Sequence, residues 1–141
     1  MQSPSFDIQV GGAEANVAVG LAHLGHATTM ISAVPDNALG RGAVSSIRAH
    51  GVDCKKVQIR DGRMGLYFLA QGAGLRASEI VYDRLGSSFA QATAADFDWD
   101  ELLAHAQMLH LSGITPALGP QSAEAALAAA KAAVRLGVPI S

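Results

Sequence analysis

Stretches that favour helices alternate along this sequence with short runs that favour strands, and this alternation constrains the fold more than any other feature. The helical stretches are residues 13–24, 38–50, 92–105 and 120–136, and the strand-like runs are residues 27–34, 52–59, 106–112 and 138–141. Residues 27–34, for example, are apolar and β-branched, as is typical of a strand buried on both faces. This order predicts an α/β fold with a mostly parallel, doubly wound sheet and helices on both faces.

Periodicity and glycine positions set the expected helix boundaries. In the first helical stretch Val17, Leu21 and Leu24 recur at i, i+4 and i+7, which predicts one apolar face. Gly25 follows directly and is expected to end this helix, because glycine suits the residue after a helix C-terminus. The segment GITPALGP, residues 113–120, is rich in glycine and proline and predicts a loop.

One pair of strands interrupts the alternation. Residues 66–71 and 78–84 are rich in strand-forming residues, and the glycine-containing segment 72–77 separates them. Two such runs joined by a short turn predict an antiparallel hairpin. Since a hairpin does not continue a parallel sheet, we expect it to project from the sheet.

Composition excludes several classes of function. Hydrophobic residues make up 50% of the 141 residues, only 16% are charged and the net charge is −2, which indicates one globular domain that does not bind nucleic acid. No apolar run is long enough to span a bilayer, and the N-terminus does not resemble a signal peptide, so a cytoplasmic location without a membrane partner is expected.

Cysteine and histidine spacing gives no metal site. Cys54 is the only cysteine, which excludes an intrachain disulfide, and it is expected to be a small buried residue. His23 and His26 lie close in sequence, but Gly25 breaks the helix between them. The other histidines show no ligand spacing, so no metal is expected in this chain.

The first candidate site is the segment GGAEAN, where Gly11 and Gly12 precede the first helix. Glycine lets the backbone approach a ligand closely, and the first N–H groups of a helix are unpaired donors. Asn16 adds an amide that donates and accepts hydrogen bonds, a combination that suits sugar hydroxyls. The alternative is a simple glycine turn in which the asparagine caps the helix backbone.

The second candidate site is the hairpin. Tyr82 and Arg84 are two residues apart, so both side chains lie on one face of a strand, and Tyr67 on the partner strand is expected to share that face. An arginine beside two phenols can bind a carboxylate and hydroxyl groups. The alternative is an exposed arginine without a ligand.

Residues 110–115 lie at the C-terminal end of a predicted strand, where open α/β sheets place ligands. The alternative is an ordinary loop from a strand to a helix.

A dinucleotide site is a further alternative. The segment GRGAVS, Gly40 to Ser45, is a near match to the Gly-x-Gly-x-x-Gly pattern, and Asp61 lies about 20 residues further on. Ser45 replaces the third glycine, and PDNAL separates the strand from the glycines, where the pattern requires a tight turn. This site requires that Gly40 lie in such a turn.

Taken together, these segments resemble the PfkB, or ribokinase-type, family of carbohydrate kinases. GGAEANVAVGLAHLG is similar to the first signature of the family, and PDNALGRGAVSSIRAHGVD to its next block. Within the family, GLYFL, IVYDRLGSSFA and LHLSGITPAL are most similar to the 2-keto-3-deoxygluconate (KDG) kinase branch. The resemblance covers residues 10–141 and implies a ribokinase-like fold, with a small β lid formed by segments 6–12 and 64–85.

The resemblance also implies roles for individual residues. The glycine turn and Asn16 would contact sugar hydroxyls, Arg84 would pair with the carboxylate of a sugar acid, and lid residues would face the sugar. The implied substrate-binding residues are Gly11, Gly12, Asn16, Tyr67, Tyr82, Arg84 and Ile114. In this family the lid often mediates dimerisation, so a homodimer or higher oligomer is expected.

The sequence departs from the family pattern in two places. Pro35 stands where the family usually has glycine, and the second signature, Gly-Ala-Gly-Asp, which supplies the anion hole and the aspartate base, is absent. The family's first strand is also missing upstream of Phe6. We therefore expect residues 1–141 to be the N-terminal, sugar-binding part of a kinase, with no catalytic residue, and with ATP and Mg²⁺ bound elsewhere in the complete enzyme.

Three functions remain open at this point, and the third, a nucleotide-binding oxidoreductase domain, requires a tight glycine turn at Gly40, against which the predicted loop argues. The first is the sugar-binding half of an ATP-dependent sugar-acid kinase, inactive by itself. The second is a truncated, non-catalytic paralogue that binds a sugar or forms a dimer through its lid.

Overall fold

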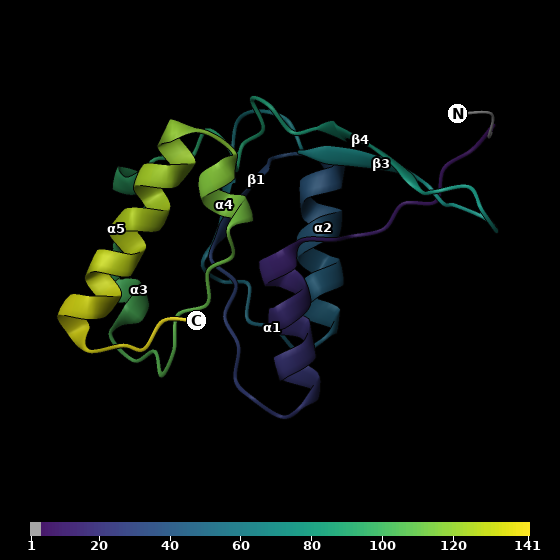
Figure 1. The fold of residues 1–141 in the computed structure, drawn as a ribbon. Coiled ribbons are helices and arrows are strands. Elements are labelled where there is room, and N and C mark those ends of the chain that lie inside the picture. The colour runs from purple at the N-terminus through teal and green to yellow at the C-terminus, as the bar shows by residue number, and fades with distance from the viewer. Residues whose placement is uncertain (1–3) are drawn as a thin grey trace.

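The computed structural model describes residues 4–141, which form three layers. The elements in chain order are α1 (Ala13–His23), β1 (Ser32–Pro35), α2 (Ala38–Ala49), β2 (Val57–Arg60), β3 (Leu66–Ala70), β4 (Glu79–Asp83), the 3₁₀ helix η1 (Ala94–Asp96), α3 (Trp99–Leu103), α4 (Ile114–Ala117) and α5 (Pro120–Leu136). Figure 1 shows α3 and α5 on one side of the central strand layer and α1 and α2 on the other. The expected α/β fold with helices on both faces is confirmed.

The central layer consists of parallel pairs. β1 pairs with β2 in parallel, with Ser32 opposite Val57, and an isolated parallel bridge joins Thr29 to Asp53. A second parallel bridge joins Leu109 to Ile140, where the Leu109 N–H donates to the Pro139 carbonyl at 2.9 Å. The predicted strands are therefore parallel. Among the described residues, the regular strands β1 and β2 are shorter than the predicted runs 27–34 and 52–59.

The helix boundaries follow local chemistry. α5 begins at Pro120 and ends at Leu136, and Gly137 then adopts a left-handed conformation with φ 70°. Gly25, after α1, has φ 88°, as its position predicted. α2 begins after Asn37, whose side-chain oxygen accepts hydrogen bonds from the Leu39 and Gly40 N–H groups.

Two segments differ from the prediction. Residues 92–105 do not form one helix, because the buried Phe97 separates η1 from α3 and Asp98 caps α3 through the Glu101 N–H. The loop predicted for residues 113–120 is wrong in part, since Ile114–Ala117 form the short helix α4. The Ser112 hydroxyl accepts a hydrogen bond from the Ile114 N–H, and α4 packs on α5, so a tertiary contact stabilises a turn that glycine and proline disfavour.

Small residues allow close packing in the core. Ala129 and Ala133 on α5 are fully buried and pack with Leu103 and Leu109. A second cluster forms where Ala33 of β1 meets Phe97 and Ala92, and Trp99 packs against both clusters.

Cys54 is buried, as expected, and burial raises the pKa of its thiol. No helix formed by residues 4–141 is both long and apolar enough to cross a bilayer.

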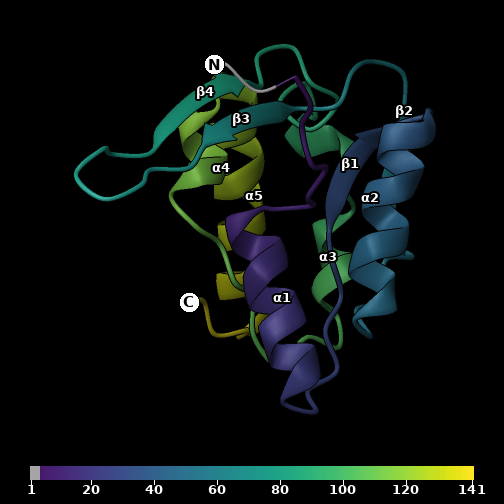
Figure 2. The same ribbon diagram turned by 90° about the vertical axis from the view of Figure 1, so that its right-hand side faces the viewer.

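The hairpin predicted from the sequence is confirmed. β3 and β4 are antiparallel, with Tyr67 opposite Tyr82 and Leu69 opposite Ile80. In Figure 2 the hairpin extends beyond the helical layers, past the N-terminal end of α1. At its base Arg63 forms a two-pronged ion pair with Asp83, with one Nη1–Oδ1 contact of 2.7 Å, and this hydrogen bond holds the pKa of Asp83 below its ordinary value.

Candidate functional site

The start of α1 presents the first part of the candidate site. Gly12 is the N-cap residue of α1, and the Asn16 N–H donates to its carbonyl at 2.8 Å. The Asn16 side chain is exposed and caps no backbone group of the helix. The alternative in which this amide serves the helix start is therefore wrong, and the amide lies at the surface one turn after the glycines.

The hairpin touches this glycine turn through Tyr67. A methyl group in place of a Gly11 hydrogen would lie 2.8 Å from the Tyr67 hydroxyl oxygen, so only glycine fits at this position without a shift. The Tyr67 and Tyr82 rings lie 6.2 Å apart on the same face of the hairpin. The Arg84 guanidinium carbon lies 4.2 Å from the centre of the Tyr82 ring, within the range of a cation–π interaction. The structure thus brings Gly11, Tyr67, Tyr82 and Arg84 into one continuous series of contacts.

The two arginines near the hairpin differ in their partners. Arg63 is paired with Asp83, whereas Arg84, within the part of the chain that the structure describes, forms no ion pair with a carboxylate. The Arg84 side chain is half-buried, and its stem lies near Gly65. A partly buried guanidinium without an anion is suited to bind a carboxylate or phosphate group of a ligand.

Glu14 connects the glycine turn to the distant loop before α4. Its carboxylate oxygen Oε1 accepts hydrogen bonds from the Ser112 hydroxyl at 2.7 Å, the Thr115 hydroxyl at 2.8 Å and the Ser112 N–H at 3.2 Å. Burial alone would raise the pKa of Glu14, but these hydrogen bonds outweigh it and hold the pKa below its ordinary value. This carboxylate fixes the start of α1 against the start of α4.

The sequence did not indicate these hydrogen bonds from Ser112 and Thr115 to the Glu14 carboxylate, which we call the Glu14 brace. A glutamate in the first turn of a helix is common, because it complements the helix dipole, so Glu14 gave no distinctive signal. Its partner Ser112 lies 98 residues away along the chain. A hydroxyl-rich loop after a predicted strand was the only available hint.

Ile114, the remaining predicted residue, is the first residue of α4 and is partly exposed. The Glu14 brace to Ser112 and Thr115 places it beside the start of α1. Figure 2 shows the hairpin lying over both helix starts. No hydrogen bond or ring contact joins Asn16 or Ile114 directly to the tyrosines or to Arg84 among the described residues, so the predicted residues form an open surface in two adjoining parts.

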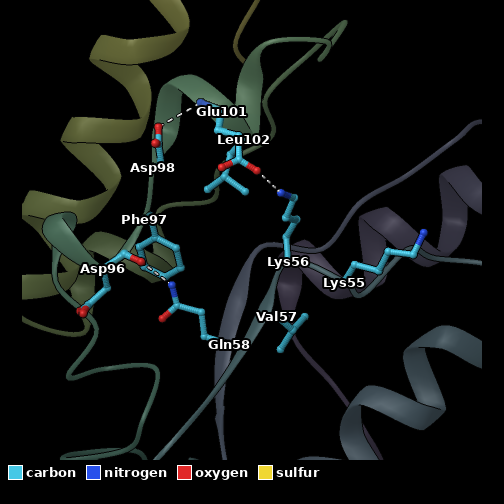
Figure 3. A pocket seen from close by; sticks show the side chains of 9 residues that line it. All are labelled: Lys55, Lys56, Val57, Gln58, Asp96, Phe97, Asp98, Glu101 and Leu102. Carbon is cyan, nitrogen blue, oxygen red and sulfur yellow. Dashed lines mark hydrogen bonds and ion pairs between the residues drawn. The ribbon is translucent and has the colours of Figure 1, made fainter.

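Two hollows of the molecule lie elsewhere. One, of about 340 Å³, lies between β2 and the η1–α3 segment (Figure 3), where Lys56 reaches Glu101 at 2.6 Å and Gln58 donates to the Asp96 carbonyl. A second, of about 460 Å³, is lined by residues at the ends of β1 and β2, which are Asp36, Ile59, Arg60 and Asp61. Neither contains one of the implied substrate-binding residues, although the second contains Asp61, named above for the dinucleotide alternative. In the first hollow, Lys56 and Gln58 on one wall contact Glu101 and Asp96 on the other.

The dinucleotide alternative is wrong. Gly40 and Gly42 lie inside α2 rather than in a turn after a strand. Gly40 is required for a different reason: a methyl group there would lie 2.0 Å from the Pro35 carbonyl oxygen. Pro35 itself is compatible with the fold as the last residue of β1, and its carbonyl accepts the Asn37 N–H at 2.9 Å.

Comparison with known proteins identifies the family and the fold. Residues 1–139 match the pfkB family carbohydrate kinase. The crystal structure of a 2-dehydro-3-deoxygluconokinase from Thermotoga maritima superposes with a TM-score of 0.94 at 41% identity, over 99% of this chain and 43% of that one. A PfkB family carbohydrate kinase from Listeria grayi gives 0.92 at 44% identity, over 99% of this chain and 43% of that one.

Curated relatives give the same family. A 2-dehydro-3-deoxygalactonokinase from Haloferax volcanii is 35% identical over 114 residues, which are 81% of this chain and 36% of that protein. A 2-dehydro-3-deoxygluconokinase from Thermoproteus tenax is 32% identical over 80% of this chain and 35% of that protein. The chain thus spans little more than a third of the length of these two relatives. Because the family model matches residues 1–139, almost the entire chain, the chain belongs to the pfkB family of carbohydrate kinases.

Proposed function

We propose that the protein containing this chain transfers phosphate from ATP to a sugar acid such as 2-keto-3-deoxygluconate, and that this chain supplies the sugar-binding part. The observation that carries the proposal is the Arg84 guanidinium, which lies over Tyr82 without a carboxylate partner in the described chain. The relatives named as kinases of dehydro-deoxy sugar acids support the same substrate class.

Each residue has a role that its chemistry allows. Arg84 binds the carboxylate of the sugar acid with two parallel hydrogen bonds. The hydroxyls of Tyr67 and Tyr82, the Asn16 amide and the backbone at Gly11 and Gly12 bind hydroxyl groups, and Ile114 supplies an apolar wall. Glu14 keeps the two helix starts at a fixed separation. Holding the sugar in one orientation is a large part of catalysis in phosphoryl transfer.

Mg²⁺ does not fit the residues of this surface. Magnesium requires carboxylate or phosphate oxygens, whereas the side chains offered here are neutral or cationic and the one carboxylate, Glu14, is occupied by three donors. Among the described residues no three His, Cys, Asp or Glu side chains cluster as metal ligands. We therefore assign nucleotide, metal and the base that deprotonates the sugar hydroxyl to the remainder of the complete enzyme.

The substrate assignment is tested with Arg84→Ala and Arg76→Ala in the complete enzyme. Arg76 lies in the exposed turn of the hairpin and serves as the matched control. We expect Arg84→Ala to raise KM for KDG by at least about tenfold, as the loss of a charged hydrogen-bonded pair predicts, and to affect ribose much less. Equal losses for KDG and ribose would show that Arg84 is structural.

The chain alone is expected to have no turnover. A coupled assay of ADP release with KDG and ATP measures this directly. Turnover by the purified 141-residue chain would refute the assignment of the catalytic groups to the remainder, while leaving the sugar site intact.

A second function, dimerisation through the hairpin, has an observation in its favour. Leu69 and Ile80 pair on the same hairpin face as the tyrosines, and they are 44% and 45% exposed. We propose that a second copy covers these side chains, and light scattering after size exclusion measures the mass. Ile80→Lys should yield monomers if this face is the interface. Dimers that survive the substitution would exclude this interface.

We also propose a reducing, cytoplasmic location, because such an environment suits the free buried thiol of Cys54.

A further inference from the structure

His23 and His50 come together at one end of the molecule, although 27 residues separate them. His23 is the last residue of α1, and His50 is the C-cap residue of α2. The His23 Nε2 atom lies 3.2 Å from the His50 Nδ1 atom, and the ring centres lie 5.2 Å apart. Both side chains are exposed, and neither belongs to the sugar-binding surface.

The spacing of these nitrogens matches that of two ligands on one zinc ion. Two imidazole nitrogens bound to a tetrahedral zinc at about 2.05 Å lie about 3.3 Å apart, and the ring centres then lie about 5.2 Å apart. Ligands at right angles, as in square-planar copper or nickel sites, lie closer, at about 2.9 Å. The observed pair is nearer to the tetrahedral arrangement.

The electrostatic setting favours a cation. Both histidines lie at helix C-termini, the negative ends of the helix dipoles, where N–H groups of the residues that follow pair with several of the last carbonyls. Arg48, in the last turn of α2, is the opposing positive charge on that helix. The two C-terminal ends are held close together, since a methyl group on Gly51 would lie 3.9 Å from the Ala22 Cβ atom. Gly25 and Gly51, both with φ 88°, follow the C-cap residues of α1 and α2, and both imidazoles are exposed.

We propose that His23 and His50 bind one Zn²⁺ ion through Nε2 and Nδ1, with water completing a tetrahedral shell. The ion replaces the hydrogen bond between the rings and links the C-terminal ends of α1 and α2. Both rings must be neutral to bind it, so binding weakens in acid. This site is independent of the proposed kinase function.

The experiment is a calorimetric titration of the untagged chain with ZnCl₂ at about pH 7.5, where free imidazole is mostly neutral. We expect one saturable site with micromolar affinity. His23→Gln and His50→Gln should each weaken it at least about tenfold, because each removes one of two protein ligands. His105→Gln, an exposed histidine elsewhere, is the control and should leave binding unchanged.

A second measurement separates this site from scattered surface binding. Zinc should raise the midpoint of thermal unfolding of the parent chain and of His105→Gln, because a ligand bound only to the native state stabilises it. Zinc should raise the midpoint much less for His23→Gln and His50→Gln. Circular dichroism verifies that these two variants are folded. Absence of saturable binding, or undiminished binding in both His23→Gln and His50→Gln, would overturn the proposal.

Discussion

The core of the helix-covered body and the β3–β4 hairpin use similar residues in opposite ways. In the body, Leu103 is 2% exposed and Ala129 is fully buried, and each packs against residues of other elements. In the hairpin, Leu69, Ile80 and Tyr82 are 44–58% exposed. Apolar side chains that remain exposed on a regular hairpin gain little from burial within this chain, so we infer that they serve contacts outside it.

This difference separates stability from function. Substitutions in the body should change the free energy of unfolding, whereas substitutions on the exposed hairpin face should change binding. The following measurements test that separation, from the largest expected effect to the smallest.

Leucine truncation in each region tests it most directly. Leu103→Ala should lower the free energy of unfolding by about 2–5 kcal/mol, because it leaves a cavity in the core. Leu69→Ala, in the hairpin, should cost less than about 1 kcal/mol. Urea unfolding followed by circular dichroism measures both. Similar losses would mean that the hairpin is an integral part of the core.

Two glycines of the same helix provide a matched pair. Gly40→Ala should destabilise the chain by about 1–3 kcal/mol, because the added methyl group would meet the Pro35 carbonyl oxygen and backbone must move. Gly42 has no atom within 4 Å of such a methyl group, so Gly42→Ala should stabilise α2 by about 0.5–1 kcal/mol. Thermal unfolding midpoints should move in opposite directions. A loss at both positions would contradict the packing of α2 on β1.

Acid should loosen the Glu14 brace between the two helix starts. The folded-state pKa of Glu14 is lowered, so its contribution is complete above the unfolded value of about 4.3 and is lost as pH falls through the lower folded value. Glu14→Gln should lower stability at pH 7 by about 1 kcal/mol and flatten the loss in acid. Glu124→Gln, an exposed glutamate on α5, is the control. An unchanged acid profile in Glu14→Gln would show that the three hydrogen bonds do not depend on the charge.

The smallest effect is expected at the base of the hairpin. The Arg63–Asp83 pair is partly exposed, so Asp83→Asn should lower the unfolding midpoint only slightly. High salt should lower the midpoint slightly more in the parent chain than in the variant, because salt screens exposed charges and the variant lacks this pair. A large decrease in Asp83→Asn would mean that this pair controls the stability of the hairpin.

Much of the fold was predictable because its signals are local. Gly25, Pro120 and Gly137 mark the bounds of α1 and α5 through local backbone conformation. The Val17–Leu21–Leu24 spacing predicted the helix but not its buried face, because these side chains are 37%, 37% and 76% exposed. α4 was not predictable, because its short helix depends on packing against α5. The predicted strand at residues 106–112 reduced to a single bridge, since regular pairing depends on neighbours that lie far away in sequence.

The candidate site was likewise predictable only where its signals are local. Alternation along the hairpin was enough to place Tyr82 and Arg84 on one face. Nothing local indicated that Tyr67 would meet Gly11, or that Glu14 would bind Ser112. The sequence predicted the break at Gly25 between His23 and His26, but it did not indicate that the His23 ring would meet the His50 ring.

By itself, therefore, the sequence determined the α/β class, the order of most elements, the hairpin and the family, because periodicity, caps and turns act over a few residues. Only the tertiary structure decided which distant groups meet: Gly11 with Tyr67, Glu14 with Ser112 and His23 with His50. Such contacts form only when whole helices and strands pack into their layers, and the burial of side chains such as Ala129 and Leu103 governs that packing.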